Sequence, residues 1–276
     1  MGSRVRHVSQ LLGLATATAL CALLSGAQAG SAEGGASAPL KMAAPAPEFR
    51  LARLAYNDNF ALGFGGGRGR GGAWTTDAPE AEYHLTQGIR RLTRINTIDP
   101  DRAGGDVVLP VRPLDDDLFD YPFLYAVEVG RWYLDDAEAA RLRDYLLRGG
   151  FLMVDDFHGS LQWEGFVESM RRVFPDRDVV EIPDAHEVFH VVWDLDHKVQ
   201  IPGTAALMMG RTYEQDGVEP HWRGVFDDTG RLMVAINFNM DLGDAWELAD
   251  DPQYPQPLTA LAYRFAISYA LYAMSH

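Results

Sequence analysis

The sequence predicts an α/β fold in three layers, with a mainly parallel sheet between two layers of helices. Apolar segments of strand length alternate with helical patterns of about 10–15 residues, which is typical of parallel sheets. Two of these segments, 123–129 and 151–154, are almost continuously apolar, as expected for strands that are covered on both faces. With 276 residues, of which 47% are hydrophobic and 23% charged, the chain is also large enough to bury a substantial core.

The first half of the predicted domain begins with a strand at 49–56. A helix starts at Asp77, where Glu80 stands three residues after a candidate N-cap, the spacing of a capping box. Five apolar residues recur on one face of this helix at α-helical spacing: Ala81, Leu85, Ile89, Leu92 and Ile95. A short strand at 106–111 and the buried strand at 123–129 follow.

The second half starts with a helix that Asp135 and Glu138 cap and that ends at Gly149 and Gly150. The elements predicted after it are the buried strand 151–154, a helix at 164–173, a strand at 179–182, a hairpin of strands 225–226 and 232–238 around a turn at 228–230, and a helix at 258–274. A C-terminal hairpin and helix therefore complete the predicted domain.

The first 29 residues have the pattern of a secretory signal peptide. A start that contains Arg4 and Arg6 precedes an uncharged apolar run at 11–24, and the segment 27–29, Ala-Gln-Ala, is typical of a signal-peptidase site. We therefore expect cleavage near Ala29 and a periplasmic or extracellular protein. The apolar run is short for a bilayer span of about 20 residues, so we expect no membrane span in the mature chain.

The mature chain is expected to consist of a linker and one domain. Residues 30–47 are rich in Ala, Gly, Ser and Pro, which favours a flexible linker, and residues 48–276 are expected to form a single domain. The only cysteine, Cys21, lies in the predicted signal peptide, so the mature chain has no thiol for a disulfide, a metal or catalysis. A net charge of −15 argues against nucleic acid and anionic membranes as partners.

Several short sequences occur together in this chain. They are Tyr121-Pro-Phe-Leu-Tyr125, Asp155-Asp156, Phe174-Pro175, His186 and Asn237-x-Asn239-x-Asp241-x-Gly243-Asp244-x-Trp246-Glu247. In this combination the chain resembles the bacterial domain-of-unknown-function family 4159 over residues 48–275. That family is similar to the class I glutamine-amidotransferase-like superfamily, which also contains the carbohydrate-linked ThuA-like proteins. The resemblance implies a flavodoxin-like, amidotransferase-like sandwich in an exported protein.

Glutaminase chemistry does not follow from this resemblance. A glutamine amidotransferase needs a cysteine nucleophile at the turn between a strand and a helix, activated by a histidine. The turn after the strand at 123–129 reads Glu128-Val129-Gly130-Arg131 and contains no Cys, Ser or Thr. The hydrolase pattern G-x-S-x-G is absent as well. We therefore exclude glutaminase activity and expect binding rather than catalysis.

Charged side chains follow two neighbouring strands of the predicted sheet. Asp155, Asp156 and His158 come directly after the strand at 151–154, and Glu128 and Arg131 come at the end of the preceding strand. Ligands bind at the carboxyl ends of strands in open α/β sheets. Adjacent carboxylates with an imidazole suit a hard divalent cation or an acid–base pair. The alternative is that Asp155 or Asp156 caps the following helix and the other side chains are solvated.

A second group of oxygen-bearing side chains is Asn237, Asn239 and Asp241. If the strand at 232–238 continues, its alternation points all three to one face, where they can bind a cation or sugar hydroxyls. The alternative is a structural turn in which these side chains bond to the backbone.

The segment His186-Glu187-Val188-Phe189-His190 matches the zinc-protease motif H-E-x-x-H. That chemistry needs an α-helix, so that both imidazoles share one face. Val188 and its β-branched neighbours favour a strand or a turn instead, and only the distant Glu214 is a candidate for the third ligand. The match is therefore interpreted as incidental, with zinc on His186 and His190 kept as an alternative.

These residues lead to three hypotheses of function. The first is an exported binding or accessory protein without a nucleophile or cofactor, whose ligand is a small molecule, a glycan or a partner protein; its cleft contains Glu128, Arg131, Asp155, Asp156, His158, Asn239 and Asp241. The second is a hydrolase or isomerase of carbohydrates, with Asp155 or Asp156 as the base, His158 as the acid and a divalent cation as the cofactor. The third is a zinc peptidase. We favour the first.

Overall fold

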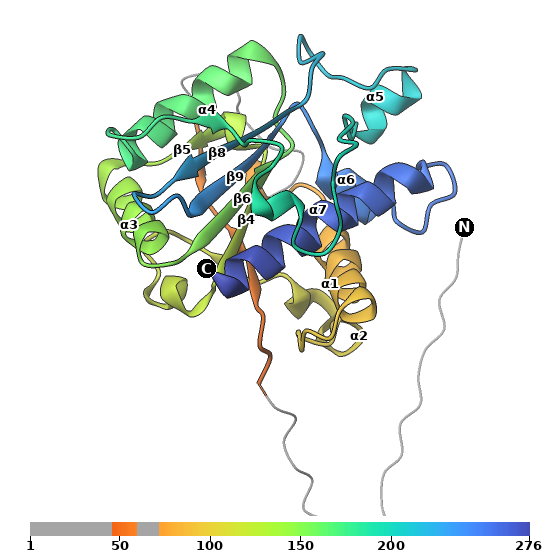
Figure 1. Cartoon of the computed structure of the whole chain (residues 1–276), viewed down its shortest axis with the longest axis horizontal. Coiled ribbons are helices and arrows are strands. Elements are labelled where there is room, and N and C mark those ends of the chain that lie inside the picture. The colour runs from red at the N-terminus through yellow and green to blue at the C-terminus, as the bar shows by residue number, and fades with distance from the viewer. Residues whose placement is uncertain (1–45, 60–71) are drawn as a thin grey trace, which may run out of the picture. The chain divides into compact units, whose positions relative to one another are not determined.

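A seven-stranded sheet lies at the centre of the fold (Figure 1). Its strands are β1 (Leu51–Leu54), β3 (Pro110–Val111), β4 (Phe123–Val127), β6 (Phe151–Asp155), β7 (Val180–Glu181), β8 (His221–Phe226) and β9 (Leu232–Phe238), and a separate antiparallel pair consists of β2 (Asn57–Asp58) and β5 (Trp132–Tyr133). The computed structural model describes residues 46–59 and 72–276, so the predicted signal peptide and the predicted linker up to residue 45 lie outside the described residues.

The strands are mainly parallel, as predicted. Their order across the sheet is β3-β1-β4-β6-β9-β8-β7. All neighbours from β3 to β9 run parallel, and β8 pairs antiparallel with β9 and with β7. The predicted hairpin is therefore confirmed as β8 and β9, and it adds an antiparallel edge to a parallel sheet.

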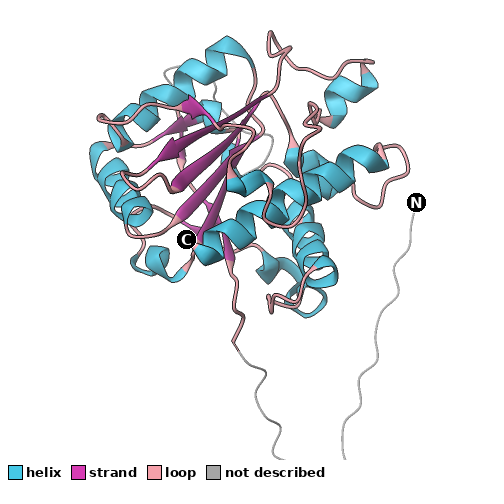
Figure 2. Ribbon diagram, viewed as in Figure 1, coloured by secondary structure: helices cyan, strands magenta, loops and turns pink. Residues whose placement is uncertain are grey.

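Helices cover both faces of the sheet (Figure 2). The α-helices are α1 (Glu80–Leu92), α2 (Pro100–Ala103), α3 (Asp136–Leu147), α4 (Gly159–Val173), α5 (Thr204–Met208), α6 (Leu242–Glu247) and α7 (Gln256–Ser275). Short 3-10 helices are η2 (Ala73–Thr75), η3 (Gly104–Val107), η4 (Asp116–Asp120), η5 (Val129–Arg131) and η6 (Glu187–Phe189). The arrangement confirms the predicted three-layer α/β class and is consistent with a flavodoxin-like sandwich.

The central strand β4 has no charged residue because both of its faces pack against helices. Phe123 and Tyr125 of β4 belong to a core with residues of α1, α6 and α7. Leu124 and Ala126 of the same strand belong to a second core with residues of α3 and α4. Successive side chains of a strand point to opposite faces, so a strand between two helical layers has no polar face.

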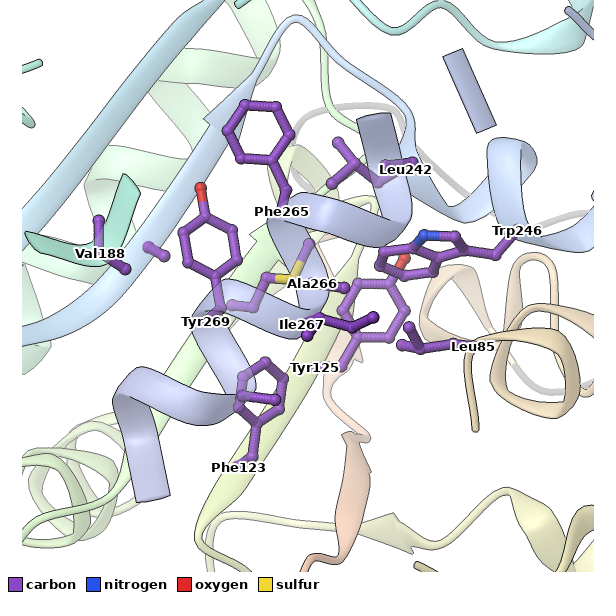
Figure 3. Close-up of a cluster of buried hydrophobic side chains, with 14 of the residues drawn as sticks. Leu85, Phe123, Tyr125, Val188, Leu242, Trp246, Phe265, Ala266, Ile267 and Tyr269 are labelled. Carbon is purple, nitrogen blue, oxygen red and sulfur yellow. The ribbon is translucent and has the colours of Figure 1, made fainter. Parts of the chain in front are cut away.

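The C-terminal helix α7 lies across one face of the sheet, as Figure 3 shows for Phe265, Ile267 and Tyr269. In the same core the rings of Tyr125 and Trp246 are 5.4 Å apart between centroids, which joins α6 to β4. Among the described residues, no helix has both the length and the apolar character needed to cross a membrane.

Three local predictions need correction. The helix predicted from Asp77 begins at Glu80, because Asp77 has a φ of +62° and its side chain caps nothing. In the segment predicted as a strand at 106–111, only the two residues of β3 are a strand, and η3 precedes them. Helix α4 begins at Gly159 and not at 164. The capping box of Asp135 and Glu138 on α3 is confirmed.

A buried ion pair joins β1 to α1. The side chains of Arg53 and Glu82 are 0% and 1% exposed, and the Arg53 Nε donates to Glu82 Oε1. The Arg53 Nη1 also donates to the carbonyl oxygens of Trp74 and Thr76, at 3.0 and 2.7 Å. Arg53 therefore fixes the segment that leads to Asp77.

Candidate functional site

The ends of β4 and β6 border a cleft of about 660 Å³, which we call the acidic pocket. Among the described residues, its charged lining consists of seven carboxylates and one guanidinium: Asp77, Glu128, Asp156, Glu214, Asp241, Asp244, Glu247 and Arg131. Helices α5 and α6, both at the right of Figure 1, contribute further lining through Thr204, Met208 and Leu248. The pocket lies at the carboxyl edge of the parallel strands, where open α/β sheets bind ligands.

The parallel register brings the first two carboxylates together. Val127 of β4 stands opposite Asp155 of β6, so Glu128 and Asp156 leave their strands side by side. The backbone N–H of Glu128 donates to the carbonyl oxygens of Asp155 and Asp156 at 3.2 and 3.1 Å. Glu128 and Asp156 both have a positive φ, of 53° and 51°, which is unusual for residues other than glycine. These two turns direct both side chains to the pocket.

The carboxylate of Asp155 lies beneath the pocket and does not line it. The side chain is fully buried, and Oδ2 accepts hydrogen bonds from the backbone N–H groups of Leu242 and Gly243 at 2.7 and 3.1 Å. These groups belong to the first turn of α6, whose N–H donors have no partner within the helix. Burial nevertheless raises the pKa of Asp155 to about 7, against the effect of these hydrogen bonds. Asp155 therefore positions α6.

Helix α6 carries three of the acidic side chains. Asp241 is its N-cap, and Asp241 Oδ1 accepts from the backbone N–H of Asp244 at 2.7 Å. Asp244 Oδ2 in turn accepts from the backbone N–H of Thr204 at 2.6 Å, which joins α6 to the start of α5. Asp244 and Glu247 are three residues apart and therefore share one face of the helix.

In the described lining of the pocket, the negative charge exceeds what the one guanidinium, that of Arg131, can balance. Arg131 pairs with Glu128, with 3.1 Å between Nε and Oε2. Burial raises the pKa of Asp156 and of Asp241 well above the usual range for aspartate, and the neighbouring carboxylates raise it further. Burial and the adjacent Asp244 raise the pKa of Glu247 to about 7. The folded protein therefore disfavours full ionisation of the pocket.

These pKa shifts predict how stability depends on pH. A carboxyl group with a raised pKa binds more protons in the folded chain than in the unfolded chain, so its stabilising effect is lost as the pH rises through the folded-state pKa. Buried His158, whose pKa is lowered to about 4, acts in the opposite sense, but only below the ordinary histidine pKa of about 6.5. We expect the Tm of the metal-free protein to fall by about 5 °C or more between about pH 6.5 and pH 8.5. Thermal melts across this window measure it, and a constant or rising Tm contradicts the prediction.

The structure brings only some of the predicted residues into the pocket. Glu128, Arg131, Asp156 and Asp241 line it. His158 is 3% exposed and lies behind Asp156, with 3.3 Å between Nε2 and Oδ1. Burial lowers the pKa of His158 to about 4, so the imidazolium form that a general acid requires is disfavoured at pH 7.

Neither Asp155 nor Asp156 caps α4, so that alternative is wrong. The first N–H groups of α4 bond to side chains from elsewhere in the chain: Gly159 N–H to Asn239 Oδ1 at 2.9 Å and Ser160 N–H to Asp216 Oδ1 at 2.8 Å.

The prediction that Asn237, Asn239 and Asp241 share one face is also wrong. Strand β9 ends at Phe238, and Asn239 has a φ of +63°, so strand alternation stops before the second residue. Asn237 Nδ2 donates to the carbonyl oxygen of Val154 at 3.3 Å. Asn239 accepts from Gly159 and borders a different surface cleft, next to α4. Of the three, only Asp241 reaches the acidic pocket.

The geometry required for a zinc peptidase is not formed at residues 186–190. The segment makes a 3-10 turn, in which His186 is the N-cap and its Nδ1 accepts from the N–H of Val188 at 3.2 Å. Both ring nitrogens of His190 lie 2.9 Å from other groups, Asp194 Oδ1 and the carbonyl oxygen of Asp184. Without an α-helix the two imidazoles do not share a face, and Glu214 lies in the acidic pocket instead.

Four carboxylates of the pocket are absent from the cleft predicted from the sequence: Asp77, Glu214, Asp244 and Glu247. Asp244 and Glu247 belong to the short sequence at 237–247 that carries the family resemblance, so the sequence contains a signal for these two residues. The sequence pattern at Asp77 predicts a helix cap instead of a pocket residue. Glu214 lies in an irregular segment, and no local pattern places it.

One family comparison matches the chain. The model of a protein family described as a domain of unknown function (DUF4159) matches residues 50–274. No curated protein matches the chain.

Proposed function

The chain belongs to the DUF4159 family, a family of unknown function, and we propose that it is an exported protein that binds a cationic ligand in the acidic pocket. The single observation that supports this function is the convergence, within the part of the chain that the structure describes, of seven carboxylates on a pocket with one guanidinium, itself paired with Glu128. Export is proposed from the signal-peptide pattern of residues 1–29. We also propose that the protein is related to the amidotransferase-like superfamily, as the sequence resemblance implies.

The charge of the pocket selects the class of ligand. Bringing a phosphate or carboxylate ligand to this lining adds like charge at short range, which costs free energy in a partly buried site. A cation has the opposite effect, because it lets the carboxylates ionise together. We therefore expect cation binding to be favourable, because the bound cation relieves the repulsion between carboxylates in the unliganded pocket.

The positions of the titratable groups favour binding over acid–base catalysis. A carbohydrate hydrolase or isomerase needs an acid and a base within hydrogen-bond reach of its substrate. Asp155 is bonded to the first turn of α6, and His158 lies behind Asp156. Asp156 is therefore the only one of these three residues that lines the pocket.

Thermal melts of the purified protein test this function. At pH 8 and constant ionic strength, we expect at least one of CaCl₂, MgCl₂, MnCl₂ or spermidine to raise the Tm. A ligand at 100 times its Kd stabilises by about 2.7 kcal/mol, which for a domain of this size is about 5–10 °C. Added NaCl at the same ionic strength is the control for screening. Stabilisation by inorganic phosphate, with no response to any of the cations, would refute the proposal.

A further inference from the structure

Three carboxylates of the acidic pocket converge more closely than the others. One oxygen from each of Asp77, Asp241 and Asp244 lies within 4.8 Å of the other two. Among the residues that the structure describes, no other group of three or more His, Cys, Asp or Glu side chains meets this criterion. We infer that these three residues hold a divalent cation of the calcium class, an inference that rests on the proposed cationic ligand and identifies it.

Two buried oxygen atoms of this pocket have no hydrogen-bond partner within residues 46–59 and 72–276. Asp77 Oδ2 is inaccessible to solvent and accepts no hydrogen bond, although its carboxyl group is almost completely buried. Thr204 Oγ1 is likewise buried without a partner, and the N–H of the same residue donates to Asp244. An unpaired buried oxygen costs free energy, and a metal ion provides the partner that the protein does not. Thr204 adds a neutral oxygen to the three carboxylates.

Two glycines leave room for the carboxylates to converge. A Cβ atom at Gly243 would collide with Asp77 Oδ2 and lie 3.4 Å from Asp241 Oδ1. A Cβ atom at Gly203 would lie 2.8 Å from Asp241 Oδ2 and 3.3 Å from Asp244 Oδ2. A side chain at either glycine would therefore displace these oxygens.

The spacing of the oxygens suits calcium. Calcium–oxygen distances are about 2.3–2.6 Å, so one ion can bridge oxygens up to about 4.6–5.2 Å apart. The oxygens of Asp77, Asp241 and Asp244 lie within 4.8 Å of one another, a bound that one calcium ion can span. Magnesium demands near-ideal octahedral geometry and usually keeps several waters, so a cluster of protein oxygens favours calcium. Calcium accepts 6–8 oxygen ligands, and Thr204, further carboxylates and water can complete that number.

Isothermal titration calorimetry of the purified protein with CaCl₂, at pH 8 in 150 mM NaCl, tests the inference. We expect one site per chain with a Kd of about 0.1–1 mM, the range of extracellular calcium modules. Asp77→Asn and Asp244→Asn should each weaken calcium binding about 10-fold or more, since even indirect support of a metal ligand is worth that much. Asparagine tolerates the positive φ of Asp77, so this variant keeps the local backbone.

Glu247→Gln is the matched control. It removes one carboxylate from the same pocket, and Glu247 lies outside the group formed by Asp77, Asp241 and Asp244. We expect it to weaken calcium binding less than about 3-fold, through the field of the pocket and the contact of Glu247 with Asp244. Asp77→Asn should also raise the Tm of the chelator-treated protein, which a merely structural role of Asp77 would not do. Equal losses for Glu247→Gln and Asp77→Asn would overturn the three-residue site.

The calcium inference and the proposed function fail in different ways. If spermidine raises the Tm but the calcium titration shows no heat of binding, the cationic ligand is supported and the calcium site is overturned. If no cation binds at all, both are overturned. Calcium binding that Asp77→Asn and Asp244→Asn weaken selectively supports both.

Discussion

Replacing Glu82 with methionine is expected to destabilise the protein by about 3–5 kcal/mol. The change leaves the guanidinium of Arg53, which is 0% exposed, without its carboxylate. A buried charge that loses its partner keeps the cost of leaving water and loses the attraction that compensated for it. The free energy of unfolding from urea denaturation measures the effect, and a loss below about 1 kcal/mol contradicts it.

The double variant Arg53→Met/Glu82→Met is the control for this prediction. Replacing both members of a buried ion pair with apolar side chains of similar size is often neutral or even stabilising. Here Arg53 also binds the carbonyl oxygens of Trp74 and Thr76, so a moderate loss remains. We expect the double variant to be more stable than Glu82→Met alone. In the double variant, the segment before Asp77 no longer has its hydrogen bonds to Arg53, so we also expect weaker cation binding.

Replacing Asp155 with alanine should cost about 2–5 kcal/mol and abolish the response to cations. Two buried N–H donors, of Leu242 and Gly243, lose their acceptor, and each unsatisfied donor costs about 1–3 kcal/mol. These donors form the first turn of α6, which holds Asp241 and Asp244 in the pocket. Loss of the cation response without loss of stability would mean that Asp155 binds the ligand itself.

Asp155→Asn separates the hydrogen bonds from the charge. The asparagine oxygen can still accept from the first turn of α6, and the amide resembles the protonated carboxyl group. Because the pKa of Asp155 is raised to about 7, the native side chain is already largely protonated at pH 6. We expect the variant to stay within about 1 kcal/mol of the native protein at pH 6. Urea denaturation of both variants at this pH checks the contrast.

The central sheet could be predicted because burial on both faces leaves a direct trace in the sequence. A strand such as 123–127 has no polar face, so it reads as a continuous apolar run. The rule that ligands meet the carboxyl ends of parallel strands predicted Glu128 and Asp156 as members of one cleft, and both line the acidic pocket. The parallel register sets Glu128 and Asp156 side by side, because Val127 stands opposite Asp155.

The rest of the site depends on backbone conformations and long-range contacts that local patterns do not encode. Asp77 has the right spacing for a helix cap, but a positive φ turns it into the pocket. Asn239 breaks the alternation of β9 in the same way. Glu214 comes from an irregular segment and Thr204 from the start of the short helix α5, and only the folded chain shows that both line the pocket beside residues of α6.

The most direct test of the calcium site is an anomalous difference map from crystals grown with CaCl₂ at pH 8. We expect one peak about 2.3–2.6 Å from an oxygen of each of Asp77, Asp241 and Asp244. A map with no peak between these side chains, or with calcium bound only to carboxylates on the outer surface, would contradict it.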